Sequence, residues 1–177
     1  MPRLIKQRAL AQDDYLLLRD ARSLTDVPDG VRAIVPLALW TERRSALIAR
    51  GEIGVWLAPS DDPATLAVDL APLPVIAIDF PQFTDGRGYS LARLLRERYR
   101  YVGELRAIGD VGRDQLYYLA QCGFDAFLLP DGRDADAALA SFNDFSDGYQ
   151  ATAARAPWFR RRQGAATNAI DAQFPCG

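Results

Sequence analysis

The chain has 177 residues, with 20 Arg, a single Lys, 19 Asp, 4 Glu, 2 Cys and no His, and its formal net charge is −2. The length suits one domain, and a hydrophobic fraction of 49% excludes a chain that is disordered throughout. Without His, the chain cannot build a Ser-His-Asp or Cys-His nucleophile, a His-ligated zinc or haem, or an HExxH protease site. Cys122 and Cys176 lie far apart and form no CxxC motif, so a complete cysteine-ligated iron–sulfur cluster is also excluded.

The charge and hydropathy patterns also limit where the protein acts. A negative net charge argues against non-specific nucleic-acid binding, which needs a strong basic field. Residues 1–15 carry charges without the apolar core of a signal peptide, and no stretch approaches the roughly 18 apolar residues of a membrane span. We therefore expect a cytoplasmic protein that binds neither nucleic acid nor membranes.

The first third of the chain predicts short strands and one helix. Tyr15–Leu18 is a short apolar run typical of a peripheral strand, and Val31–Leu39 is an extended segment interrupted by proline. An amphipathic helix is predicted over Trp40–Arg50, with Gly51 as the residue that ends it. Ile53–Ala58 is a continuous apolar run, which favours a buried strand.

The middle of the chain continues this alternation. One or two helical turns are predicted over Pro63–Leu70, and Val75–Phe80 is a strand rich in β-branched residues. Gly88–Arg100 has helical periodicity and is followed by a strand at Leu105–Gly109. The apolar residues of this helix that share one face are Leu91, Leu94, Leu95 and Tyr99.

The last predicted elements follow the same order. Asp110 is a candidate cap for a helix over Val111–Cys122, and Gly123 is its candidate end. A strand is predicted at Phe124–Leu129 and an amphipathic helix at Asp134–Phe145. Cys122, at the end of its helix, is expected to be a small buried residue rather than a reactive thiol.

Continuous apolar strands that alternate with helices are typical of a parallel sheet buried on both faces. We therefore predict an α/β fold with a mainly parallel sheet, and the periodicity leaves an open sheet and a partial barrel as alternatives. Residues 1–162 are expected to form one domain, and residues 163–177 a disordered tail. The aromatic and basic segment Trp158–Arg162 is either an interface anchor or a terminal segment that closes the core.

Ligands bind beyond the carboxyl ends of parallel strands, and two polar loops follow predicted strands here. Both loops precede helices, so we expect them to open at the same edge of the sheet. Asp79 and Asp110 are the catalytic candidates, as general acids or bases. The candidates for anion binding or docking are Thr84, Asp85, Gly86, Arg87, Gly88, Tyr89, Ser90, Arg93, Arg106, Arg113, Asp114 and Gln115.

Each candidate also has a structural interpretation. Gly86 and Gly88 can let backbone N–H groups approach an anion at a helix start, or can simply turn the chain, and they do not form a dinucleotide or P-loop motif. An acid within an apolar strand must be paired if it is buried, and Arg106 in the next strand is the candidate partner of Asp79. No metal site is predicted.

Five sequence blocks, most of them in or beside these loops, are the most specific for a family resemblance. They are Asp79-Phe80-Pro81, the run Phe83 to Ser90, Gly109-Asp110-Val111, Arg113-Asp114-Gln115 and Cys122-Gly123-Phe124-Asp125. With them, the chain from about Leu37 to Arg162 resembles a bacterial family of unknown biochemical function that is encoded beside the haemoprotein subunit of sulfite reductase. Members of that family are often labelled as probable oxidoreductases involved in sulfite reduction.

The resemblance implies a pathway, assimilatory sulfite reduction, and a partner, the sulfite reductase haemoprotein. Because no flavin, nicotinamide, haem or cluster motif is present, we expect no cofactor and an accessory role of binding or assisting that haemoprotein. The alternative is an enzyme that acts on a small anionic or phosphorylated metabolite, with Thr84–Ser90 holding the anion. A third, weaker alternative is an electron carrier.

Overall fold

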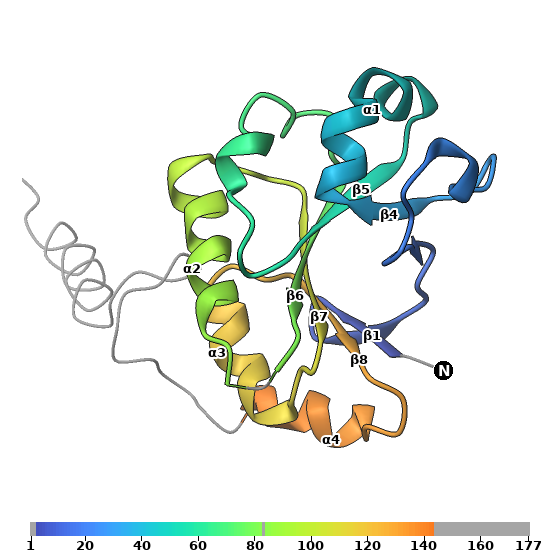
Figure 1. Cartoon of the computed structure of the whole chain (residues 1–177). Helices are drawn as coiled ribbons and strands as arrows, with labels where there is room; N and C mark the ends of the chain where they lie inside the picture. Colours follow the sequence, from blue (N-terminus) through green and yellow to red (C-terminus); the bar gives the residue numbers. More distant parts are fainter. Residues whose placement is uncertain (1–2, 83, 144–177) are drawn as a thin grey trace, which may run out of the picture.

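The computed structural model describes residues 3–82 and 84–143, and its centre is one eight-stranded sheet (Figure 1). The strand order is β2-β1-β8-β7-β6-β5-β4-β3. Strands β3 to β8 run parallel to one another, whereas β1 is antiparallel to both of its neighbours. The strands are β1 (Arg3–Lys6), β2 (Ala9–Ala11), β3 (Leu16–Leu17), β4 (Ala33–Pro36), β5 (Ile53–Leu57), β6 (Val75–Phe80), β7 (Glu104–Gly109) and β8 (Ala126–Leu129).

Helices and helical turns connect the parallel strands. The α-helices are α1 (Leu37–Arg50), α2 (Arg87–Arg93), α3 (Leu116–Gln121) and α4 (Ala135–Ala140). The 3₁₀ turns are η1 (Leu24–Asp26), η2 (Pro63–Leu66), η4 (Arg113–Gln115) and η5 (Ser141–Asn143), and η3 (Leu94–Arg98) is a π turn that continues α2. Within the described ranges, no helix combines the length and the apolar character needed to cross a bilayer.

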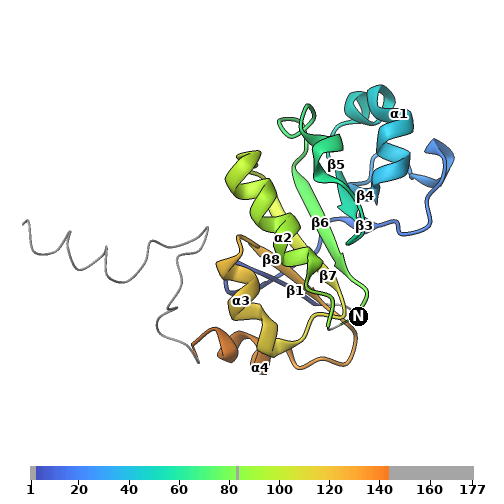
Figure 2. The same ribbon diagram turned by 60° about the vertical axis from the view of Figure 1, so that its left-hand side comes forward.

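Both faces of the sheet are apolar, as the continuous hydrophobic strands predict. One face packs against α1, α2 and α3 and forms the main core, in which Val55, Ile78 and Leu105 are fully buried (Figure 2). The opposite face carries a smaller cluster of Ile34, Val75, Ala77 and Ile108. This second face has no helix layer and is covered by the N-terminal part of the chain (Figure 1).

The connection between β2 and β3 requires the sheet to curl. These are the two edge strands, and only residues 12–15 separate them in the chain. A flat sheet of eight strands places its edges about 34 Å apart at a spacing of about 4.8 Å. The chain from Ala11 to Leu16 spans at most about 17 Å. The sheet is therefore open but curled, a half-barrel, which decides between the alternatives that the sequence left open.

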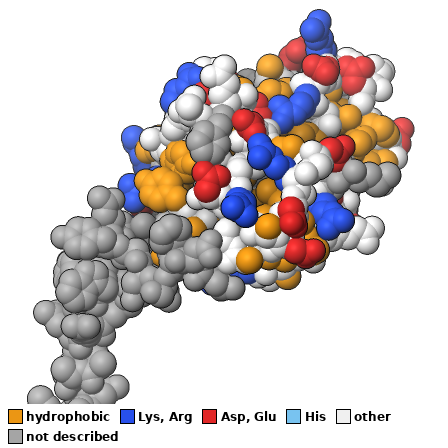
Figure 3. Space-filling model, turned by 90° about the horizontal axis from the view of Figure 1, so that it is seen from below, with side chains coloured by type: hydrophobic (Ala, Val, Ile, Leu, Met, Phe, Trp, Pro, Cys, Tyr) orange, Lys and Arg blue, Asp and Glu red, His pale blue; other side chains and the backbone are white. Residues whose placement is uncertain are grey.

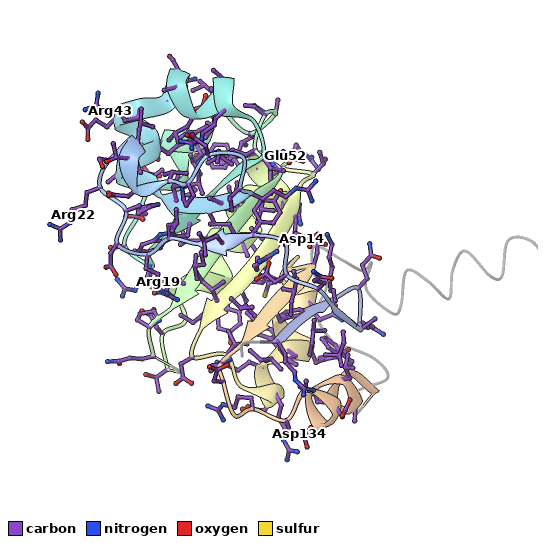
Figure 4. The ribbon with its side chains drawn as sticks, turned by 90° about the vertical axis from the view of Figure 1, so that its right-hand side faces the viewer. Asp14, Arg19, Arg22, Arg43, Glu52 and Asp134 are labelled. Carbon is purple, nitrogen blue, oxygen red and sulfur yellow. The ribbon has the colours of Figure 1, made fainter. Side chains whose placement is uncertain are left out.

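Residues 12–19, here called the crossing segment, lie over the concave face of this curled sheet, where Asp14 and Arg19 mark their path (Figure 4). Two ion pairs join the crossing segment to the strands below it. Asp13 Oδ1 lies 2.7 Å from Arg106 Nη1, and Arg19 Nη2 lies 2.8 Å from Asp79 Oδ1. Because Arg106 is only 2% exposed, its charge must be compensated by carboxylate partners, of which Asp13 is the one from the crossing segment.

Arg106 has a second acidic partner, Glu104, on its own strand. Glu104 Oε1 accepts hydrogen bonds from the Arg106 guanidinium at 2.8 Å, and its other oxygen lies 2.6 Å from Lys6 Nζ. The Tyr15 ring packs between the guanidinium groups of Arg106 and Arg32, at 5.6 and 6.0 Å from the ring centre. The charges on the concave face are thus neutralised within the chain.

The predicted elements are confirmed in type, and the differences have local causes. The β1–β2 hairpin is absent from the prediction, because its strands are three or four residues long and its turn residues Gln7 and Arg8 are not turn formers, although both have positive φ. Helix α1 begins at Leu37, directly after Pro36, rather than at Trp40.

Two helices start or run differently from their prediction. The helix predicted over Val111–Cys122 begins at Arg113 as a 3₁₀ turn whose cap is Gly112, so Asp110 is not its cap. The π turn η3 changes the helical period after Arg93, and Leu94 is 38% exposed although its periodicity placed it with buried Leu91 and Leu95.

Some predicted features lie outside the described residues. These are the end of the helix predicted to reach Phe145, the segment Trp158–Arg162, the tail over 163–177 and the boundary of the domain at residue 162. Cys122 lies within the described part and is fully buried, as predicted, and burial raises the pKa of its thiol.

Replacing the buried guanidinium tests how much the fold depends on the ion pairs of the crossing segment. We expect Arg106→Leu to lower the free energy of unfolding by about 3–5 kcal/mol, because it leaves Asp13 without its guanidinium partner and buried Glu104 with Lys6 alone. Urea denaturation followed by circular dichroism measures this loss. Arg43→Leu, in the ion pair with Glu42 whose two side chains are both exposed, is the matched control and should cost far less. Equal losses in the two variants would contradict the interpretation.

Candidate functional site

The two polar loops predicted from the sequence meet at one end of the sheet. The loops that follow β6, β7 and β8 all lie at the lower end of the molecule (Figure 1). The Asp110 N–H donates a 2.7 Å hydrogen bond to the Phe80 carbonyl, which joins the first two loops directly. Gly109 has a φ of +94°, and a Cβ on it would lie 2.7 Å from Asp79 Oδ1. A glycine is therefore required where these loops approach.

The first loop is a locally closed unit. Asp85 accepts hydrogen bonds from the side chain of Arg87 at 3.0 and 2.7 Å and from the Arg87 N–H at 3.1 Å. These bonds lower the pKa of Asp85 and raise the pKa of Arg87. Thr84, Gly86 and Ser90 are exposed beside this pair. The Arg87 charge is thus presented to solvent together with its own counter-ion.

Gly88 has a packing role in the structure. It is buried at the start of α2, and a Cβ on it would lie 2.5 Å from the Phe80 ring. Tyr89, the next residue, packs edge-on against the same ring, with the two ring centres 5.4 Å apart. Gly88 therefore lets α2 approach β6 closely. This is a structural role and not an anion-binding role.

Tyr89 and Gln115 connect the helices that follow the two loops. The Tyr89 ring lies 5.0 Å from the Tyr118 ring in α3, and its hydroxyl interacts with the Gln115 side chain. Gln115 is buried, and its Oε1 accepts a 3.0 Å hydrogen bond from the Gly112 N–H. Burial raises the pKa of Tyr89. Tyr89 and Gln115 therefore link the two loops to each other. Arg93, a further candidate, is partly buried at the end of α2.

A cavity of about 340 Å³ opens at the carboxyl ends of β7 and β8. Arg113, Asp114 and Arg133 line it, together with the first residues of α4. Arg133 Nη2 lies 3.1 Å from Asp110 Oδ1, and both side chains of this pair are about half exposed. Arg113 is exposed and, within residues 3–82 and 84–143, makes no ion pair. Among the described residues that line this cavity, Arg113 is thus a guanidinium without an ion-pair partner, and Arg133 is one held by Asp110.

This edge carries basic and acidic side chains side by side rather than a field of one sign (Figure 3). Asp134 has a structural role at this edge, because its Oδ1 accepts hydrogen bonds from the N–H groups of Asp136 and Ala137 and so caps α4. A guanidinium recognises carboxylates and other oxyanions through paired hydrogen bonds. The arrangement is suited to binding an oxyanion or an acidic surface.

The predicted ion pair between Asp79 and Arg106 is wrong. Both residues lie on the concave face, but Arg106 pairs in register with Ala77, two positions before Asp79 along β6. The Arg106 side chain reaches Glu104 and Asp13, and Asp79 is instead held by Arg19 of the crossing segment. Arg106 is therefore separated from the other anion-binding or docking candidates, which lie in the loops or on the helix-covered side.

The sequence interpretation missed two residues of this region. Arg133 follows β8 and belongs to the third polar loop at the same edge, so the strand-end argument applied to β8 would have found it. Arg19 carries no sequence signal, because only the curl of the sheet brings it to Asp79. In the described ranges, no three His, Cys, Asp or Glu side chains gather as metal ligands.

Comparing variants of two nearby glycines tests whether Gly88 has a packing role. We expect Gly88→Ala to lower the free energy of unfolding by about 1–3 kcal/mol, because its methyl group would overlap the Phe80 ring. Gly86→Ala is the control, since a Cβ there meets nothing within 4 Å, and it should change stability by less than about 0.5 kcal/mol. Thermal or urea unfolding measures both. A neutral Gly88→Ala variant would contradict the packing role.

Comparison with known families assigns the chain to one of them. No curated protein matches it significantly. A family model for bacterial proteins of unknown function (DUF934) matches residues 54–159, which include the loops after β6, β7 and β8. Because this match covers more than half of the sequence, the chain belongs to that bacterial family of unknown function.

Proposed function

We propose that this protein is an accessory protein of assimilatory sulfite reduction that docks on the haemoprotein subunit of sulfite reductase. The resemblance of its loop blocks to the family encoded beside that subunit suggests the pathway, and membership of the bacterial family is consistent with it. The docking surface of the proposal is the carboxyl edge of the sheet, around the cavity that Arg113 and Arg133 line.

The observation that carries the proposal is the pair of guanidinium groups at this cavity. Arg113 has no carboxylate partner in the described part of the chain, and Arg133 shares only an exposed pair with Asp110. Exposed ion pairs contribute little in water, so exchanging Asp110 for a partner carboxylate costs little. Arginine is also enriched at the centres of protein interfaces. Both features favour an acidic surface of the haemoprotein as the contact.

Close contacts of the described loop residues support docking rather than a mobile active-site lid. Gly88 and Gly109 fix the approach of the loops to β6, and Gln115 fixes the turn that precedes Arg113. A surface that is already ordered loses little conformational freedom on binding. In this proposal the electrons of sulfite reduction travel through the cofactors of the haemoprotein, and this chain supplies ion pairing and positioning.

The same cavity supports a second candidate, an enzyme that acts on a small anionic or phosphorylated metabolite. A volume of about 340 Å³ is sufficient for a small oxyanion. Arg113 and Arg133 would hold the anion, and Asp110, 3.1 Å from Arg133, would move a proton. Asp79 is less suited to this role, because it lies on the concave face and is held by Arg19.

Binding to the purified haemoprotein tests the docking proposal. We expect Arg113→Ala and Arg133→Ala to weaken the complex about tenfold each, equivalent to about 1.4 kcal/mol. Biolayer interferometry with the immobilised full-length chain measures the affinity. Arg22→Ala is the control, because Arg22 is exposed after β3, the edge strand farthest from β8 among the parallel strands, and lies well away from Asp134 (Figure 4). No measurable binding of the wild-type chain would reject the proposal.

A thermal-shift titration with sulfite, sulfate and phosphate separates the two candidates. A small-anion enzyme predicts saturable stabilisation, about 2.7 kcal/mol at one hundred times Kd, that is lost in the double variant of Arg113 and Arg133. A docking protein predicts no saturable effect of these ions. In the cell, the docking proposal further requires that a deletion strain grow on sulfide and fail on sulfate and sulfite; normal growth on sulfite would contradict it.

A further inference from the structure

A second concave surface lies at the other end of the sheet, where β6 and β7 begin. This groove has a volume of about 350 Å³ and is apolar along most of its length. One wall is the chain that follows η2, and the other is the chain between η3 and β7. The lining residues are Ala67, Val68, Leu70, Ala71, Tyr99, Arg100, Tyr101 and Val102.

The groove holds the two most exposed large apolar side chains of the described residues. Val102 is 95% exposed and Val68 is 74% exposed. Isolated exposed apolar residues are common on protein surfaces, but a group of them that shares one concavity is typical of an interaction site. Leu70, Ala71 and Tyr99 extend the same apolar surface.

The first wall is held rigidly from the inside by Asp69. Its carboxylate accepts a 3.1 Å hydrogen bond from Trp40 Nε1 and forms an ion pair with Arg44, both in α1. Asp69 is only 3% exposed. Because this buried side chain fixes the turn between exposed Val68 and half-buried Leu70, the exposure of Val68 is a defined feature of the surface.

The second wall is fixed by Arg96 and Tyr101. Arg96 Nη1 donates to the carbonyl groups of Tyr101 and Gly103, at 2.6 and 2.9 Å. The Tyr101 hydroxyl donates to the Leu73 carbonyl at 3.1 Å, and burial raises the pKa of Tyr101 so that this proton is retained. Val102 lies between these anchored residues. Its outward side chain therefore does not result from a loose loop.

The charge of the groove is positive. Arg100 is the only charged residue among the eight that line it, and its φ of +55° is unusual for a residue other than glycine. Arg98 stacks over the Tyr99 ring, with its guanidinium carbon 5.7 Å from the ring centre. Within residues 3–82 and 84–143, neither arginine has an ion-pair partner.

We propose that this groove binds an acidic segment of a partner protein that inserts one aliphatic or aromatic side chain between Val68 and Val102. Arg100, with Arg98 at the rim, pairs with the carboxylates that flank this anchor. A second copy of the chain is a poorer occupant, because a two-fold contact at this groove would bring Arg100 of both copies together. The inference is independent of the proposed function, which uses the opposite edge of the sheet.

Selection of random dodecapeptides by phage display on the immobilised full-length chain tests the proposal. The selected peptides should share one large apolar residue beside two or more Asp or Glu residues. Fluorescence anisotropy of a selected peptide should then show that Val102→Asp and Arg100→Glu weaken binding at least tenfold. The matched controls are Val31→Asp and Arg22→Glu, at exposed positions away from the groove, and they should bind as the wild type does.

Circular dichroism of each variant checks that the fold is retained. We expect it to be, because Val102 and Arg100 are exposed. The proposal is overturned if no acidic-apolar consensus is selected or if Val102→Asp leaves binding unchanged. It is also overturned if sedimentation shows self-association that Val102→Asp abolishes, or if Val102 is required for binding anionic lipid vesicles. Because Arg113→Ala and Arg133→Ala should leave peptide binding unchanged, failure here is distinguishable from failure of the haemoprotein proposal.

Discussion

The four residues between β2 and β3 impose the constraint on which the rest of the structure depends. They join the two edges of an eight-stranded sheet, so the sheet must curl until its edges are within reach of a very short connection. The curl creates a concave face, and the connection itself must lie over it. Asp13 and Arg19 are thereby brought to Arg106 and Asp79, which are far from them in the sequence. A single covalent restriction thus determines the architecture and the partners of its buried charges.

The balance of charge on the concave face explains why the candidate surfaces lie at the ends of the sheet. Arg106 is satisfied by Asp13 and Glu104, and Glu104 is shared with Lys6. A buried charge with a complete set of partners is costly to disturb, because removing one partner leaves another uncompensated. At the ends of the sheet, by contrast, Arg113 and Arg100 are exposed and have no carboxylate partner in the described ranges. Charge available for binding is therefore located where the strands begin and end.

Local patterns predicted the elements of this fold, and long-range geometry determined what they did not predict. The runs at Val75–Phe80 and Ile53–Ala58 predicted strands correctly, because a strand buried on both faces can be recognised from its continuous apolar sequence alone. The two polar loops meet at the carboxyl ends of the parallel strands, as the sequence predicted. The pairing of Asp79 was predicted wrongly, because nearness of strands says little about where a long arginine side chain reaches. Its true partner, Arg19, depends on the curl, which no local pattern encodes.

The two glycines of the first loop show how a functional motif and a packing requirement give the same sequence signal. Gly86 caps α2 and Gly88 lies in its first turn, as glycines of anion sites do, yet only Gly86 faces open space. Gly88 is required by the Phe80 ring, and Arg87 between them is already bonded to Asp85. Binding potential in this region therefore depends on side chains that lack internal partners and not on glycine content. Within residues 3–82 and 84–143, Arg113 and Arg100 are two exposed arginines that meet this criterion and also line a cavity, and the two surfaces proposed above lie at opposite ends of the sheet.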